Sequence, residues 1–296
     1  MTVAIYVPLL LALTLAGSAR WIAARGTPGS AARALTAIAA IAAAASTWSL
    51  TLLALTMLDD LPPLAALDNH ATVELPEPVP GPVALVAGLA LLAGSVRLWL
   101  DIHRRTRTHR QLRAVGAAQQ GLVIADWSAP LAVAVPGQLG HDGHLLVTTG
   151  ILRLLNAEER RVVFAHEQAH LAHGHHRLVA VAAAAAALNP LLVPVRDAVA
   201  YLVERWADEE AALAVGDRDL TAQAVARAAL ATLGSGPSAA LGIHGGAAVH
   251  RVQALAEPTP APRRRRLIGP ALLGAGCVTA MVVATVEFVA LARAWL

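Results

Sequence analysis

The stretch VVFAHEQAHLAHGHH, Val162–His176, decides how this chain is to be interpreted. It places five histidines and one glutamate within eleven residues of a chain that is 56% hydrophobic. Its segment HEQAH, from His166 to His170, is the pattern H-E-x-x-H. Histidines four positions apart share one face of a helix, so both imidazoles can bind one metal ion. Glu167 lies further around the helix, where it can act as a general base on a metal-bound water during hydrolysis.

Three more histidines follow, and none of them is expected to bind the metal. His176 has the spacing of the third ligand in one class of zinc protease, the metzincins, but that class has glycine where this chain has His173. Without that glycine the helix continues and carries His176 away from the ion. We therefore expect His173, His175 and His176 to form a solvated or headgroup-facing cluster.

A catalytic zinc site needs a third protein ligand and an open position for water. The downstream sequence VERWADEE offers Glu204, with Asp208 four residues later on the same helix face. We expect one zinc ion per chain, with Asp208 accepting a hydrogen bond from the outer nitrogen of a ligand histidine. The expected metal ligands are His166, His170 and Glu204.

Four apolar segments are long enough to cross a bilayer, which takes ~20 residues. They are Val3–Ser18, Leu35–Leu58, Val83–Leu100 and Leu267–Val286. A signal peptide is the competing interpretation of the first, but its basic residues follow the apolar run instead of preceding it. The net charge of +3 is too small and too dispersed to indicate nucleic-acid binding. The expected partners are the lipid bilayer and a protein or peptide substrate.

Charged residues between these segments predict the orientation. Arginines follow the first segment without any acid, and they also follow the third segment and precede the last, whereas residues 59–82 are acidic and contain no arginine. The positive-inside rule puts residues 19–34 and 101–266 in the cytoplasm, with the acidic loop and both termini outside.

The cytoplasmic segment reads as a small α+β domain. After a basic helix over 103–120, three short β-type runs bounded by Pro, Gly and Asp predict a sheet of about three strands: Leu122–Asp126, Pro130–Gly137 and His144–Gly150. Asn156 and Glu159 form a capping box that starts a long helix, which nothing interrupts before Asn189. Further helices are expected from Pro194 to Gly216 and over Leu220–Leu233, with linkers at Gly234–Ser238 and Glu257–Pro262.

The apolar stretch 178–203 is constrained by the metal site. A single membrane crossing there would put His166 and Glu204 on opposite sides of the bilayer. We therefore expect a hairpin of two helices whose apolar ends dip into the inner leaflet, rest on it, or pack on the spans.

These observations predict a mainly α, integral membrane fold with about four transmembrane helices and a zincin-like α+β metalloprotease domain with an active-site helix pair. The expected divisions are three spans with the acidic loop over 1–102, the cytoplasmic metalloprotease domain with the hairpin over 103–265, and a last span over 266–296.

The sequence from Leu145 to His176, followed by ERWADEEAA, resembles the membrane zinc metallopeptidases of the BlaR/MecR antirepressor type. It is similar, more distantly, to the HtpX and CAAX-prenyl endopeptidase group. In those gluzincins H-E-x-x-H is followed by E-x-x-x-D on the next helix, and Glu204 and Asp208 match that spacing. The chain ends just after its last expected span, without the penicillin-binding sensor domain of the antirepressors. The resemblance thus implies a multi-pass bacterial plasma-membrane peptidase and not a β-lactam sensor.

The expected activity is endopeptidase cleavage at a membrane-proximal cytoplasmic site, for example of a repressor or a membrane protein. The strand at LAVAVPG would hold the substrate extended. A catalytically silent zinc-binding sensor or scaffold is the alternative. The natural substrate, the activating signal and the oligomeric state stay open, as does the oxyanion-stabilising residue, for which the candidates are Tyr201, Arg205, His244 and His250.

Overall fold

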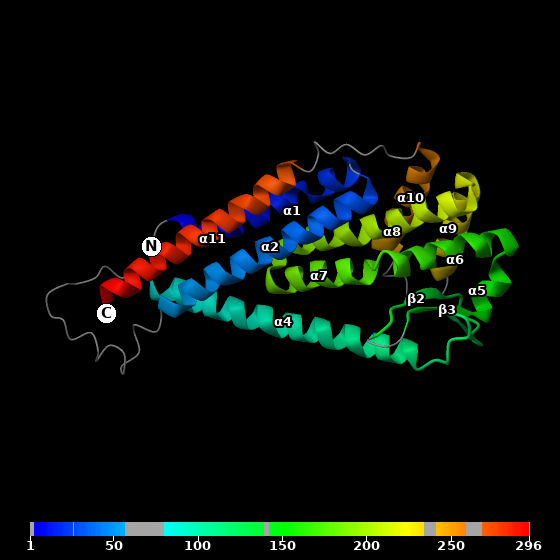
Figure 1. Cartoon of the computed structure of the whole chain (residues 1–296), viewed down its shortest axis with the longest axis horizontal. Coiled ribbons are helices and arrows are strands. Elements are labelled where there is room, and N and C mark those ends of the chain that lie inside the picture. Colours follow the sequence, from blue (N-terminus) through cyan, green and yellow to red (C-terminus); the bar gives the residue numbers. More distant parts are fainter. Residues whose placement is uncertain are drawn as a thin grey trace.

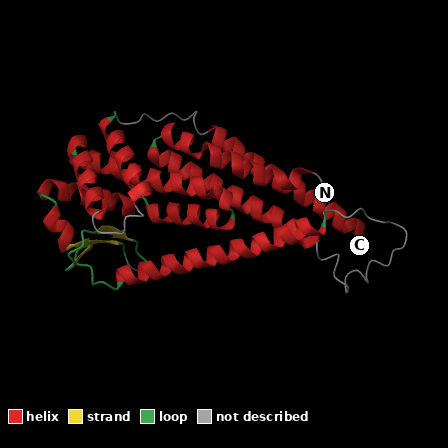
Figure 2. Ribbon diagram, turned by 180° about the vertical axis from the view of Figure 1, so that it is seen from behind, coloured by secondary structure: helices red, strands yellow, loops and turns green. Residues whose placement is uncertain are grey.

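The computed structural model describes residues 3–25, 27–56, 80–138, 142–233, 241–258 and 268–295. Helices dominate these residues, and a small sheet lies at one end of the molecule (Figures 1 and 2). Most of the expected acidic loop and of the Glu257–Pro262 linker lies outside the described residues. So do the Gly234–Ser238 linker and the arginines at 263–266.

Four helices of the described part are long and apolar enough to cross a membrane, which is compatible with a multi-pass membrane protein. They are α1 (Val7–Arg25, preceded by the 3-10 helix η1, Val3–Tyr6), α2 (Pro28–Leu55), α4 (Gly81–Arg113) and α11 (Ile268–Trp295). Helix α2 packs against the other three and is the centre of this bundle.

Helix α4 extends well beyond its expected span. The basic helix expected over 103–120 is instead the continuation of the span, and it ends at Arg113. No glycine or proline occurs between Ser95 and Arg113 to stop the helix, and Asp101 pairs with Arg105 at 2.7 Å one turn later. The apolar segment and the arginine-rich segment therefore form one unbroken helix.

The three expected strands are confirmed as β1 (Leu122–Ala125), β2 (Ala132–Val135) and β3 (His144–Thr148). Their order is β1-β3-β2, with β1 parallel and β2 antiparallel to β3, so β2 is an edge strand. The third strand is shorter than expected because α5 (Thr149–Leu154) begins there. The Thr148 hydroxyl accepts a hydrogen bond from the amide of Ile151 at 3.3 Å and caps this helix.

The prediction of one long helix from Asn156 to Asn189 is wrong, because the structure has two helices there. Helix α6 (Ala157–Ala172) starts with the expected capping box, in which Asn156 and Glu159 exchange two hydrogen bonds of 2.9 Å. It then ends at Ala172, and Gly174, whose φ of +61° is left-handed, separates it from α7 (His175–Leu188). Glycine adopts this conformation without the steric penalty that other residues meet.

Helix α7, the 3-10 helix η3 (Pro190–Leu192) and α8 (Val193–Val215) form the expected hairpin, which packs on the spans α1, α2 and α4. At its tip the Asn189 amide donates to the Ser46 hydroxyl of α2 at 3.0 Å. Arg97 of α4 donates to the carbonyl of Ala187 at 2.9 Å. The hairpin returns α8 to α6, and α9 (Arg218–Leu233) and α10 (Leu241–Ala256) pack around this pair.

The capping box at the start of α6 gives a test of the fold. Replacing Asn156 by Ala removes a side-chain acceptor for the first turn and should lower the free energy of unfolding by about 0.5–2 kcal/mol. The midpoint of thermal unfolding of the purified protein in detergent reports this loss. Asn156→Ser keeps the cap and should keep the midpoint, whereas equal midpoints for Ala and wild type would contradict the role of the cap.

Candidate metal centre

Helices α6 and α8 bring the three expected metal ligands together. Nε2 of His166 lies 3.1 Å from Nε2 of His170. The Glu204 carboxylate lies across from them, with one oxygen 3.5 Å from His166 Nε2 and the other 3.5 Å from His170 Nε2. Among the described residues, these three are the group of donors that could hold a metal ion.

The donor set fits zinc in geometry and in charge. Bonds of about 2.0–2.1 Å in a tetrahedral site put ligand atoms roughly 3.3 Å apart, and the observed separations are 3.1 and 3.5 Å. Three carboxylates, those of Glu167, Glu204 and Asp208, share the site with the single guanidinium of Arg251. The carboxylates thus outnumber the permanent cation, and a bound cation would offset the excess.

Asp208 lies on the outer side of His166. Its Oδ1 is 3.0 Å from His166 Nδ1, and the aspartate is only 1% exposed. Burial alone would favour the neutral imidazole, but the Asp208 and Glu204 carboxylates raise the pKa of His166 to about 10. The site therefore favours positive charge at this ring, and a metal ion at Nε2 would take the place of the proton there while Asp208 faces Nδ1.

Glu167 faces the same space from α6. Its carboxylate accepts a hydrogen bond of 2.7 Å from the amide of Ala134 on the edge strand β2. Burial raises the pKa of Glu167 to about 7, against the opposing effect of His166. A carboxylate with such a pKa can both accept and release a proton near neutral pH.

Arg251 of α10 is the site residue that sequence reasoning missed. Its guanidinium makes two hydrogen bonds of 2.7 Å to Asp208 and lies 3.0 Å from Glu204. Burial by itself would raise the pKa of Glu204. The neighbouring His166 and Arg251 outweigh this effect and hold the pKa of Glu204 well below its usual range. Arg251 is 43 positions from Asp208. No helical spacing links the two residues. Arg251 lies in the segment IHGGAAVHRVQAL, which resembles a later element of the related families only weakly, and this resemblance was the one sequence signal that could have pointed to Arg251.

The expectation of a solvated histidine cluster is wrong for His175. This residue is 1% exposed, and its Nδ1 lies 2.9 Å from Nδ1 of His170. His173 stays at the surface beside Glu210, 3.2 Å away, and His176 lines the cavity next to the metal site. His175 follows the left-handed Gly174 and is the first residue of α7, where it is buried.

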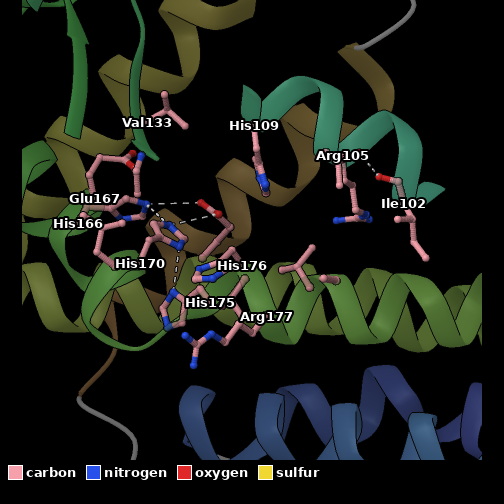
Figure 3. Close-up of a pocket in the computed structure, with 17 residues that line it drawn as sticks. Ile102, Arg105, His109, Val133, His166, Glu167, His170, His175, His176 and Arg177 are labelled. Atoms are coloured by element: carbon pink, nitrogen blue, oxygen red, sulfur yellow. Dashed lines mark hydrogen bonds and ion pairs between the residues drawn. The ribbon is translucent and has the colours of Figure 1, made fainter. Parts of the chain in front are cut away.

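The donors open into a cavity of about 590 Å³ between α4, β2, α6, α7 and α8. Figure 3 shows His109 and Arg105 extending from α4 opposite the metal-site residues. Of the oxyanion candidates, Tyr201, Arg205 and His250 are not among the residues that line the cavity, and the side chain of His244 lies outside the described part.

Comparison with known protein families gives one match, in which residues 99–195 match the model of Peptidase family M48. The matched range runs from the second half of α4 through the sheet and H-E-x-x-H and ends before Glu204. It indicates a metalloprotease hydrolase, and metallopeptidases of this family are typically zinc-dependent. Searches of curated proteins and of solved structures found no match.

Removing Arg251 tests the charge balance of the site. Arg251→Met leaves the buried carboxylate of Asp208 with His166 as its remaining partner, which should destabilise the protein by up to about 3–5 kcal/mol. Adding Asp208→Asn to Arg251→Met should recover part of this loss, because the uncompensated charge is gone. Thermal unfolding without added metal measures both effects.

Arg251→Lys is the matched control, since it keeps the charge but lacks the two-pronged guanidinium and should be intermediate. An unfolding midpoint of Arg251→Met equal to that of the wild type would show that the ion pairs contribute nothing.

Proposed function

We propose that this chain is an integral membrane zinc endopeptidase that cleaves a protein substrate at a membrane-proximal cytoplasmic site. The observation that carries the proposal is the meeting of His166, His170 and Glu204 in one cavity, with the Glu167 carboxylate beside them. The family match supports hydrolysis of peptide bonds. The antirepressor-like and HtpX-like subtypes stay predictions from the sequence.

The roles of the residues follow from their positions. His166, His170 and Glu204 would hold the zinc ion, which when bound would supply a Lewis acid for the water and for the scissile carbonyl. Glu167 takes a proton from the attacking water and later delivers it to the leaving amine. Asp208 keeps the hydrogen of His166 on Nδ1, and Arg251 holds the carboxylates of Glu204 and Asp208 in their places.

The edge strand β2 is suited to hold an extended substrate. Thr148 pairs with Leu131 through a backbone hydrogen bond of 2.9 Å, so in this antiparallel pair the polar groups of Ala132 and Ala134 point away from β3. The amide of Ala134 reaches Glu167 on that free side. A peptide added along this edge would therefore pass beside the general base.

The arrangement of the helices supports the cytoplasmic location. The arginine-bearing ends of α1, α2 and α4 all lie toward the end of the molecule that holds the metal site (Figure 1). The positive-inside rule assigns such ends to the cytoplasm.

Glu167→Gln is the decisive variant, because glutamine keeps the shape but cannot take a proton. Peptide cleavage should fall by about 10²–10⁴-fold with zinc still bound at one ion per chain, as elemental analysis would show. Full turnover in this variant would refute the protease and leave the zinc-binding sensor or scaffold as the interpretation.

The role of the β2 edge is tested at Ala132. Ala132→Pro removes an amide that β3 does not use, and proline is tolerated on edge strands. The loss of one backbone hydrogen bond to substrate should lower kcat/KM by about 3–10-fold, measured on a peptide substrate. Ala132→Ser retains the amide and serves as the control. Equal losses in the two variants would exclude pairing at this position.

The predicted orientation is tested with reporter fusions in the full chain. A fusion after Arg113 should report the cytoplasm, and one near Asp68 should report the outside. The same signal from both positions would overturn the assignment.

A further inference from the structure

The two histidines of the metal site have different partners on their outer sides. His166 Nδ1 faces Asp208, whereas His170 Nδ1 lies 2.9 Å from Nδ1 of His175. The outer nitrogen of a metal-binding histidine usually donates to a carboxylate, a backbone carbonyl or water. Because His170 Nε2 faces His166 and Glu204, the hydrogen of His170 belongs on Nδ1 and His175 Nδ1 accepts it.

Packing alone does not account for a histidine at position 175. The ring is 1% exposed, and its other nitrogen, Nε2, has no hydrogen-bond partner among the described residues. A buried polar atom without a partner costs about 1–3 kcal/mol. An apolar side chain would avoid this cost, so the contact with His170 is what histidine contributes here.

Trp206 holds the imidazole of His175 from the side. This residue of α8 lies between Glu204 and Asp208 in sequence and is 7% exposed. Its ring centre lies 4.6 Å from that of His175. The indole is itself fixed, since it stacks on His173 with centres 4.4 Å apart and donates to Glu210 at 3.0 Å.

The indole of Trp206 also fits tightly against the first turns of α2. The guanidinium carbon of Arg33 lies 4.3 Å from the centre of the ring, a cation–π distance. A Cβ atom placed on Gly29 would lie 2.8–3.0 Å from three atoms of the indole, closer than real contacts allow. An unbroken series of contacts thus runs from the end of span α2 through Trp206 and His175 to His170.

We propose that His175 is the positioning residue of His170 and that Trp206, seated against Gly29 of α2, keeps it in place. His175 sets which nitrogen of His170 carries the hydrogen and where its Nε2 points. The cytoplasmic end of span α2 therefore sets the zinc affinity of the site without contacting the ion. This inference rests on the metal site of the proposed function.

The first link is tested by zinc affinity, measured by competition with a chromogenic chelator on the full-length protein in detergent. His175→Leu should weaken zinc binding by about 10–100-fold. His175→Asn should stay within about threefold of wild type, because its side-chain oxygen offers an acceptor where Nδ1 stood. His103→Asn, on the exposed face of α4, makes the same change away from the site.

Two further measurements separate positioning from folding. Cobalt(II) substituted for zinc reports ligand geometry through its visible absorption. His175→Leu should change this spectrum while thermal unfolding without metal occurs at no lower temperature than in the wild type, and His175→Asn should restore the spectrum. Zinc affinity of His175→Leu within twofold of wild type, with an unchanged cobalt spectrum, would overturn the proposal.

The contact between Gly29 of α2 and Trp206 is tested at Gly29, which itself contacts none of the metal ligands in the series from α2 to His170. Gly29→Ala should displace Trp206 and weaken zinc binding by about 3–10-fold. Gly17→Ala in α1 is the matched control, because a Cβ there meets nothing within 4 Å. Adding Gly29→Ala to His175→Leu should cause no further loss, since the two changes act through one path.

Equal affinities of Gly29→Ala and Gly17→Ala would remove α2 from the proposal. Failure of the wild-type protein to bind zinc would instead refute the proposed function, so the two failures are distinguishable.

Discussion

The packing of α6 against α8 is the contact on which the rest of the structure depends. Val162 of α6 and Ala211 of α8 are each 1% exposed and belong to one apolar cluster. Alanine side chains let two helix backbones approach closely, and at that separation the carboxylate of Glu204 reaches both histidines of α6. The hairpin of α7 and α8, the left-handed Gly174 and the anchoring of Asn189 on α2 all serve to return α8 to this position.

The charged groups between α6 and α8 determine which ligand this site can bind. A buried carboxylate such as Asp208 is stable only with a partner, and Arg251 and His166 supply that partner from two other helices. The carboxylates of the site outnumber this guanidinium, and a cation bound by His166, His170 and Glu204 would offset the excess. The same low-polarity surroundings that demand this pairing raise the pKa of Glu167 to the range of a general base.

Local sequence rules predicted the parts of the structure that depend on short spacings. H-E-x-x-H, the E-x-x-x-D spacing, the capping box of Asn156 and the three strands all involve residues within one helix or one turn. The break at Gly174 was missed because a single glycine is tolerated in a helix, and only the packing of α7 on the spans requires it to be left-handed here. Arg251 and the buried contact of His175 depend on which helices meet in space, and no spacing in the chain records that.

The unbroken course of α4 links the membrane to the cavity in a mechanical sense. At 1.5 Å per residue a helix of 33 residues is roughly 50 Å long, whereas the hydrocarbon layer takes about 30 Å. In a bilayer the remaining segment would stand outside that layer, and its Arg105 and His109 line the cavity. Because the helix is unbroken, a change in the inclination of its apolar segment would carry Arg105 and His109 with it and so move one wall of the cavity.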